Sequence, residues 1–261
     1  MKKRGLKKGS ITRLTGFSFL PSLFSLLSLF AGFLAVFQIF NGEFPTAVYL
    51  IIASAILDGL DGTIARLTKT ESNFGVQLDS LVDAIAFGVS TSFLIYKWGF
   101  PVEFHQLGKV IAFIFLSSGI IRLARFNVIK DAGVIPSEIF IGLPIPIGAI
   151  SISSVVLFFK DSLVSSNNVI VFAFFVIVIS FLMISNVKYK TLKKVNTKIG
   201  LKLLFFFAVI VALLIIYPEK TLPLISIVYC TSPLYFFFKK IYKKKQKKVR
   251  EKRSHFSKLE K

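Results

Sequence analysis

The sequence predicts an all-α polytopic membrane protein, and three observations carry that prediction. Of the 261 residues 54% are hydrophobic, and the mean hydropathy is +0.72. A soluble domain of this size could not bury so much apolar surface in one core. The apolar residues form runs long enough to cross a bilayer, which takes roughly 20 residues. Finally, the 33 basic residues, against 13 acidic ones, gather between these runs. A single cysteine, Cys230, excludes a disulfide framework.

The chain offers eight candidate spans in succession. They run near Phe17–Phe40, Phe44–Ala65, Gly75–Tyr96, Val110–Phe126, Phe140–Phe159, Val169–Ser185, Leu203–Tyr217 and Leu222–Phe238. The first follows a basic stretch, but its apolar run is too long for a signal peptide and has no small-residue cleavage site, so we expect a retained anchor. Pro144 and Pro146 are expected to open or kink the fifth span. The last two spans are short, and they could instead form one re-entrant pair.

The basic residues set the expected orientation. With the N-terminus in the cytoplasm, 29 of the 33 Lys and Arg residues fall on the inner side, where such residues are enriched. This distribution predicts an even number of spans with both termini cytoplasmic. We therefore divide the chain into a basic segment (1–16), a transmembrane domain (17–238) and a basic tail (239–261). The tail is expected to contact anionic lipid rather than nucleic acid, because no stacking aromatic residues alternate with its charges.

Four aspartates lie inside the predicted spans, where burying a charged group is costly and usually indicates a functional site. Asp58 and Asp61 share one face of the second span, and Asp79 and Asp83 share one face of the third. Consecutive helices with a short connection are antiparallel neighbours, so the two acidic faces can meet near the cytoplasmic end. Oxygen-only ligands select hard cations such as Mg²⁺, Mn²⁺ or Ca²⁺. The pattern therefore predicts a site for divalent cations.

Small residues and an arginine accompany the acids. Gly62 and Ala65 leave space for a ligand to approach the backbone, and the guanidinium of Arg66 suits phosphate oxygens. Metals, cleared space and a phosphate-binding arginine together indicate phosphoryl transfer by a two-metal mechanism. The alternatives are ion pairs between helices or a divalent-cation transporter. A transporter has no use for a phosphate-binding arginine at that position.

The aspartates also carry a resemblance. Asp58-x-x-Asp61-Gly62-x-x-Ala65-Arg66, followed after eight residues by Gly75-x-x-x-Asp79-x-x-x-Asp83, resembles the signature of the CDP-alcohol phosphatidyltransferases. The resemblance implies a bundle of six core helices in the cell membrane, with its site open to the cytoplasm. It implies that the four aspartates would ligate two metal ions, Mg²⁺ or Mn²⁺, and that Asp83 would also accept the proton of the attacking hydroxyl. The residues implied to hold the CDP part of CDP-diacylglycerol are Gly62, Ala65, Arg66 and Gly75.

Three further stretches, Arg122–Asn127, Phe140–Pro146 and Leu182–Tyr189, are similar to blocks of the phosphatidylserine synthases within this family. They imply that the acceptor alcohol is L-serine. Two guanidinium groups three residues apart, at Arg122 and Arg125, suit the serine carboxylate, although they could equally anchor the inner membrane boundary. Asn127 could hydrogen-bond the acceptor or cap a helix. Glycerol 3-phosphate and inositol phosphate are alternative acceptors, and the sequence is compatible with a homodimer.

Overall fold

The computed structural model describes residues 19–68, 73–131, 139–159, 165–190, 213–214 and 216–233. In chain order the elements are α1 (Phe19–Phe40), α2 (Phe44–Thr68), α3 (Asn73–Asp83), the π-helix η2 (Ala84–Val89), α4 (Ser90–Gly99), the 3₁₀-helix η3 (Val102–Phe104), α5 (His105–Asp131), β1 (Ile139–Ile141), α6 (Ile145–Phe159), α7 (Ser166–Ile184) and β2 (Lys188–Lys190). A further helix occupies 218–233.

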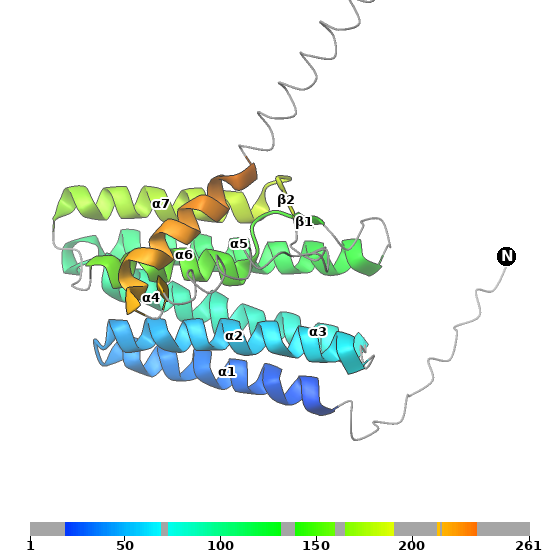
Figure 1. Cartoon of the computed structure of the whole chain (residues 1–261). Coiled ribbons are helices and arrows are strands. Elements are labelled where there is room, and N and C mark those ends of the chain that lie inside the picture. The colour runs from blue at the N-terminus through cyan, green and yellow to red at the C-terminus, as the bar shows by residue number, and fades with distance from the viewer. Residues whose placement is uncertain are drawn as a thin grey trace, which may run out of the picture.

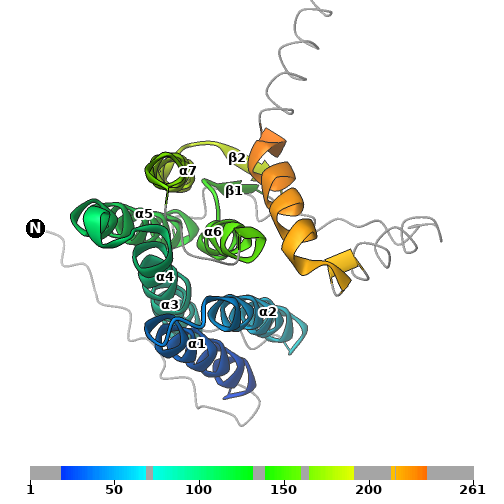
Figure 2. The same cartoon turned by 90° about the vertical axis from the view of Figure 1, so that its left-hand side faces the viewer.

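The long helices lie alongside one another in a bundle, which Figure 1 shows from the side and Figure 2 along the helices. Five are long and apolar enough to cross a membrane: Ser22–Phe40, Phe44–Ala65, Phe74–Gly99, Val102–Ile129 and Ser166–Ile184. The shorter apolar helix Ile145–Phe159 joins them. Large apolar side chains such as Phe113 and Phe174 are exposed on the outer faces, as a lipid environment requires. The structure therefore agrees with a polytopic helical membrane protein.

Small residues and hydroxyl groups bring the helices of the site together, as is usual in membranes. The hydroxyls of Ser28 in α1 and Ser54 in α2 lie 2.8 Å apart, and each donates to the backbone carbonyl of the other residue at 3.0 Å. A Cβ atom on Gly32 would lie 2.5 Å from the Cα of Ala86, so only glycine permits this approach of α1 to η2. These contacts fix α1 against both helices that carry the aspartates.

The third span contains a π-helical segment that directly follows Asp83. The helix is continuous from Asn73 to Gly99, but within η2 its hydrogen bonding widens, and the Ser90 N–H reaches the carbonyl of Ile85. A π-helical segment changes which residues face the neighbouring helices, and such segments are frequent at functional sites. Here the segment begins directly after Asp83, and its residues Ala86, Phe87 and Gly88 are buried in the core.

The structure corrects the start of the expected fifth span. Residues Ile139–Ile141 form β1, which pairs antiparallel with β2 in the register Phe140 opposite Tyr189. Gly142 takes a positive φ of 75°, and α6 begins only at Ile145, with Pro146 in its first turn. Proline favours such a position because its missing N–H is not needed there. The prolines thus open the helix, as expected, but five residues later than the apolar run suggests.

The remaining spans differ in their limits. The helix α5 extends to Asp131, beyond the predicted end of the fourth span at Phe126. Most of the predicted seventh span lies outside the described residues, as do the basic segment 1–16 and the tail 239–261. The predicted eighth span overlaps the helix at 218–233. The count of eight spans and the cytoplasmic placement of both termini stay predictions.

Candidate active site

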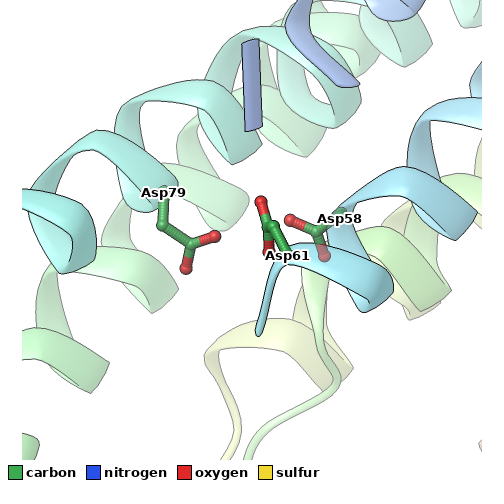
Figure 3. A group of neighbouring side chains, drawn as sticks. All are labelled: Asp58, Asp61 and Asp79. Carbon is green, nitrogen blue, oxygen red and sulfur yellow. The ribbon is translucent and has the colours of Figure 1, made fainter. Parts of the chain in front are cut away.

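Three aspartates from two helices converge at one point. Asp58 and Asp61 in α2 and Asp79 in α3 each offer a carboxylate oxygen, and these oxygens all lie within 4.8 Å of one another. Figure 3 shows Asp79 facing the other two carboxylates across the gap between the helices. The two acidic faces therefore meet, as their helical spacing predicts.

Asp83, the fourth aspartate of the predicted set, lies next to this cluster but is not among the three described residues whose carboxylate oxygens converge. Its carboxyl group is in hydrogen-bonding contact with that of Asp58 and interacts electrostatically with Asp79. The residue is only 8% exposed, and its Oδ1 atom has no hydrogen-bond partner among the described residues. A buried carboxylate oxygen without a partner is costly, so this atom is well suited to receive a ligand or a proton.

A serine outside the aspartate motif holds one of these carboxylates. The Ser25 hydroxyl in α1 donates a 2.6 Å hydrogen bond to Asp61 Oδ2, and both residues are buried. Ser25 was not predicted from the sequence as a functional residue. Its only signal was a row of serines, Ser22, Ser25 and Ser28, at helical spacing in a largely apolar span. Such a spacing indicates a face that packs on another helix, but not which residue it contacts.

Arg122 approaches the cluster from α5. It is 5% exposed and interacts electrostatically with Asp83 and Asp58, while its guanidinium carbon lies 5.6 Å from the centre of the Phe126 ring. Its Nε atom has no hydrogen-bond partner within the part of the chain that the structure describes. Arg122 is therefore a buried cation with an unused donor, and its positive charge acts on the carboxylates of Asp83 and Asp58.

Arg125, one turn further along α5, has different surroundings. Among the described residues, its Nη1 and Nη2 atoms donate hydrogen bonds to oxygen atoms of β1, of the end of α7 and of the two residues that follow α7. The acceptors are the carbonyls of Ile184 (2.6 Å), Ser185 (3.0 Å), Ile141 (3.4 Å) and Met183 (3.4 Å) and the side-chain oxygen of Asn186 (3.3 Å). The last carbonyls of a helix have no hydrogen-bond donor within the helix, and Arg125 provides donors for those of α7. The three stretches similar to phosphatidylserine synthases thus form one assembly around this side chain.

Asn127 also hydrogen-bonds within the protein. Its Nδ2 atom donates to Ser80 Oγ at 3.0 Å, and Ser80 lies between Asp79 and Asp83 in α3. Because α5 continues to Asp131, Asn127 is not a helix cap. It joins α5 to the helix that carries half of the aspartate cluster.

The residues expected to bind CDP lie on α2 and α3 near the cluster. Gly62 is exposed, and a Cβ atom built on it would have no atom within 4 Å. Packing within the protein therefore does not require glycine there, in contrast to Gly32. Ala65 and Gly75 are half-buried. The side chain of Arg66 lies outside what the structure describes.

Comparison with known proteins gives a consistent result. The family model described as CDP-alcohol phosphatidyltransferase matches residues 18–182. The chain is 38% identical over 203 residues to a CDP-diacylglycerol--serine O-phosphatidyltransferase of Helicobacter pylori, covering 77% of this chain and 84% of that protein. It is 36% identical over 179 residues to an archaetidylserine synthase of Methanothermobacter thermautotrophicus, covering 68% of this chain and 72% of the relative. The helix at 218–233 lies beyond the residues that the family model matches.

Proposed function

The chain belongs to the CDP-alcohol phosphatidyltransferase family, and from this premise we propose that it transfers the phosphatidyl group of CDP-diacylglycerol to the hydroxyl of L-serine, forming phosphatidylserine and CMP. The observation that carries the proposal is the convergence of Asp58, Asp61 and Asp79, with Asp83 and Arg122 beside them. The relatives named for serine transfer support the choice of acceptor.

The donor set fits divalent metal ions. The carboxylate oxygens of Asp58, Asp61 and Asp79 form it, and Asp83, whose Oδ1 has no hydrogen-bond partner among the described residues, is the fourth ligand that we propose. Hard cations such as Mg²⁺ or Mn²⁺ prefer such ligands, and two of them would offset the mutual repulsion of four carboxylates. We assign Asp58, Asp61, Asp79 and Asp83 as their ligands. When bound, the ions supply positive charge to the pyrophosphate and to the leaving CMP.

The CDP end of the substrate fits the open face of α2. The empty space around Gly62 admits a flat or phosphorylated group close to the backbone, and Ala65 one turn later keeps the same face small. Arg66 is the proposed phosphate-binding residue, because its planar guanidinium forms paired hydrogen bonds to phosphate oxygens. Gly75 belongs to the same proposed subsite, from α3.

The acceptor end fits Asp83 and Arg122. In the proposed reaction Asp83 accepts the proton of the serine hydroxyl, whose oxygen bonds to the lipid-linked phosphorus as the bond from that phosphorus to CMP breaks. Arg122, buried beside Asp83, binds the serine carboxylate. Arg125 and Asn127 were expected to contact serine as well. Since their hydrogen bonds are made within the protein, we now assign them a positioning role.

We place this site in the cell membrane, facing the cytoplasm. The end of α2, the start of α3 and the end of α5 lie at one end of the bundle, with the β1–β2 pair (Figure 1). The charge distribution assigns that end to the cytoplasm. The basic tail 239–261 would then bind anionic lipid on the same side.

Release of CMP from CDP-diacylglycerol by the purified protein tests the proposal. L-serine, glycerol 3-phosphate and inositol phosphate are offered in parallel with Mg²⁺ or Mn²⁺, and the lipid product is identified. We expect CMP and phosphatidylserine with serine only, and neither from the Asp83→Asn variant. CMP release with another alcohol instead would change the acceptor, and no release with any alcohol would contradict the transfer reaction.

A further inference from the structure

A groove between α4 and α5 opens on the lateral surface of the bundle. Its volume is about 370 Å³, within the range of pockets that hold a small ligand or part of a larger one. Large side chains from both sides line it, among them Val89, Phe93, Tyr96, Phe113 and Leu116. Phe93 is 36% exposed and Phe113 is 68% exposed, so the groove faces the surroundings of the bundle and not its core.

The groove is separate from the candidate active site. Asp83 and the lining residues Val89 to Tyr96 belong to the helix that is continuous from Asn73 to Gly99. At a rise of 1.5 Å per residue, these lining residues lie about 9–20 Å beyond Asp83 along the helix axis. The groove therefore lies toward the end of the bundle that the aspartates do not occupy.

The floor of the groove is apolar. The Ser92 hydroxyl donates to the backbone carbonyls of Gly88 at 2.7 Å and of Ala112 at 3.1 Å, so its one proton is used within the protein. A Cβ atom on Gly88 would lie 2.9 Å from Leu116 Cδ1, so the glycine leaves room for this apolar side chain. The inner part of the groove therefore suits a hydrocarbon chain better than a polar ligand.

Two lysines lie at the groove. Lys109 lines it directly, near the start of α5, and has no acidic partner among the described residues. The Nζ atom of Lys97 lies 5.2 Å from the centre of the Phe40 ring, whose centroid is 5.3 Å from that of the lining residue Phe93. A lysine near a helix end covers apolar surface with its stem while its ammonium reaches the headgroup region. An apolar groove with cationic groups beside it is complementary to an anionic phospholipid.

Positive charge is scarce at this end of the bundle. In the eight-span arrangement four of the 33 basic residues fall outside the cytoplasmic side, namely Lys97, Lys109, Lys160 and Lys220. Two of these four lie at this one groove. The orientation of the protein does not account for them, because positive charge favours the cytoplasmic side. An anionic ligand does account for them.

We propose that this groove binds an anionic phospholipid, with one acyl chain between α4 and α5 and the headgroup phosphate against Lys109 and Lys97. In the orientation proposed above, this lipid belongs to the outer leaflet, so it is neither the substrate nor the product at the aspartates. The inference goes beyond the proposed reaction and does not depend on it.

The test reconstitutes the full chain in phosphatidylcholine vesicles with a trace of phosphatidylglycerol that carries a photoreactive group in one acyl chain. After illumination, mass spectrometry identifies the labelled peptides. We expect label within residues 89–96 and 109–116, and we expect unlabelled phosphatidylglycerol to suppress it. Additional phosphatidylcholine or inorganic phosphate should not suppress it.

A matched pair of variants tests the role of charge. Lys109→Gln should raise the phosphatidylglycerol concentration that halves the labelling roughly fivefold, the effect of one lysine near a membrane surface. The control is Lys220→Gln, which removes the same charge from an exposed lysine of the helix at 218–233 and should leave that concentration unchanged.

Several results would overturn the inference. Equal suppression by phosphatidylcholine, or an unchanged competition curve in Lys109→Gln, would mean that the groove holds only bulk lipid. Absence of label from both segments would mean that no acyl chain enters it. Rapid disulfide formation between two copies of a Phe113→Cys, Cys230→Ala variant would mean that a second copy covers the groove. None of these measurements uses catalysis, so this inference and the proposed reaction can fail separately.

Discussion

The Ser25 hydroxyl of α1 and the Asp61 carboxylate of α2 are joined by a buried hydrogen bond of 2.6 Å. One proposed metal ligand therefore depends for its orientation on a residue outside the aspartate motif. Hydrogen bonds of this kind fix the rotamer of a ligating carboxylate, and their loss typically costs about 10- to 100-fold in metal affinity.

We accordingly expect Ser25→Ala to raise the Mg²⁺ or Mn²⁺ concentration needed for half-maximal activity by about 10- to 100-fold, with the maximal rate largely kept at saturating metal. The measurement is a metal titration of CMP release. Ser28→Ala is the matched control, because Ser28 lies one turn away and hydrogen-bonds Ser54 instead of an aspartate. An identical metal dependence in Ser25→Ala and the wild-type protein would refute a supporting role for Ser25.

The aspartate cluster itself should be inactive without metal. We expect excess chelator to abolish CMP release and Mg²⁺ or Mn²⁺ to restore it, since four adjacent carboxylates repel an anionic pyrophosphate unless cations lie among them. Asp58→Asn and Asp79→Asn should each lose nearly all activity, because each change would remove a charged carboxylate from the proposed set of metal ligands. Glu103→Gln changes an exposed acid of η3 and is the control. Full turnover in chelator, with no metal found by elemental analysis, would exclude the metal site.

The convergence of Asp58, Asp61 and Asp79 could be predicted from the sequence because it depends on residues that are close together in the chain. Asp58 and Asp61 are three residues apart, Asp79 and Asp83 four, and a short connection makes their helices neighbours. Helical periodicity and chain connectivity alone therefore bring the carboxylates together. The long apolar runs predicted the main spanning helices for the same reason.

Other features depend on partners that the sequence does not mark. Arg125 binds backbone carbonyls about 60 residues away, and a carbonyl is present at every residue whatever the side chain. Because Arg122 and Arg125 are three residues apart on one helix, the sequence alone suggested that both bind the same ligand. Likewise, the apolar run before Pro144 resembles a span, and only its pairing with β2 makes it a strand. Tertiary context decides such cases.

The two arginines should consequently respond differently to mutation. Removing a charged hydrogen bond to a buried ligand costs about 1.5–3 kcal/mol, so Arg122→Ala should raise the serine KM roughly 10- to 150-fold and barely change the KM for CDP-diacylglycerol. Arg122→Lys should recover only part of this loss, because an ammonium cannot form the paired hydrogen bonds of a guanidinium. Saturation curves for each substrate measure both effects.

Arg125→Ala should instead lower the thermal midpoint of the detergent-solubilised protein and reduce the use of both substrates together. It removes the donor of the carbonyls of Met183, Ile184 and Ser185, and a hydrogen bond to a charged group typically contributes about 1.5–3 kcal/mol, less where it is exposed as at Ile184. A selective rise in the serine KM at an unchanged midpoint would show that Arg125 is a serine ligand after all.

The orientation of the bundle is the last prediction, and the charge distribution supports it. The aspartate cluster lies on α2 and α3, and 29 of the 33 basic residues fall on the cytoplasmic side in the eight-span arrangement. Single cysteines at Lys69 and Ser257, in an active Cys230→Ala background, should resist a membrane-impermeant thiol reagent in intact cells and react once the membrane is opened. A cysteine at Glu103, exposed between α4 and α5, should react from outside and serves as the control. Labelling at Lys69 in intact cells would place the aspartates on the outer side, away from the cytoplasmic supply of both serine and CDP-linked lipid, and would contradict the proposed reaction together with the orientation. Labelling at Ser257 alone would leave the site where it is and make the number of spans odd.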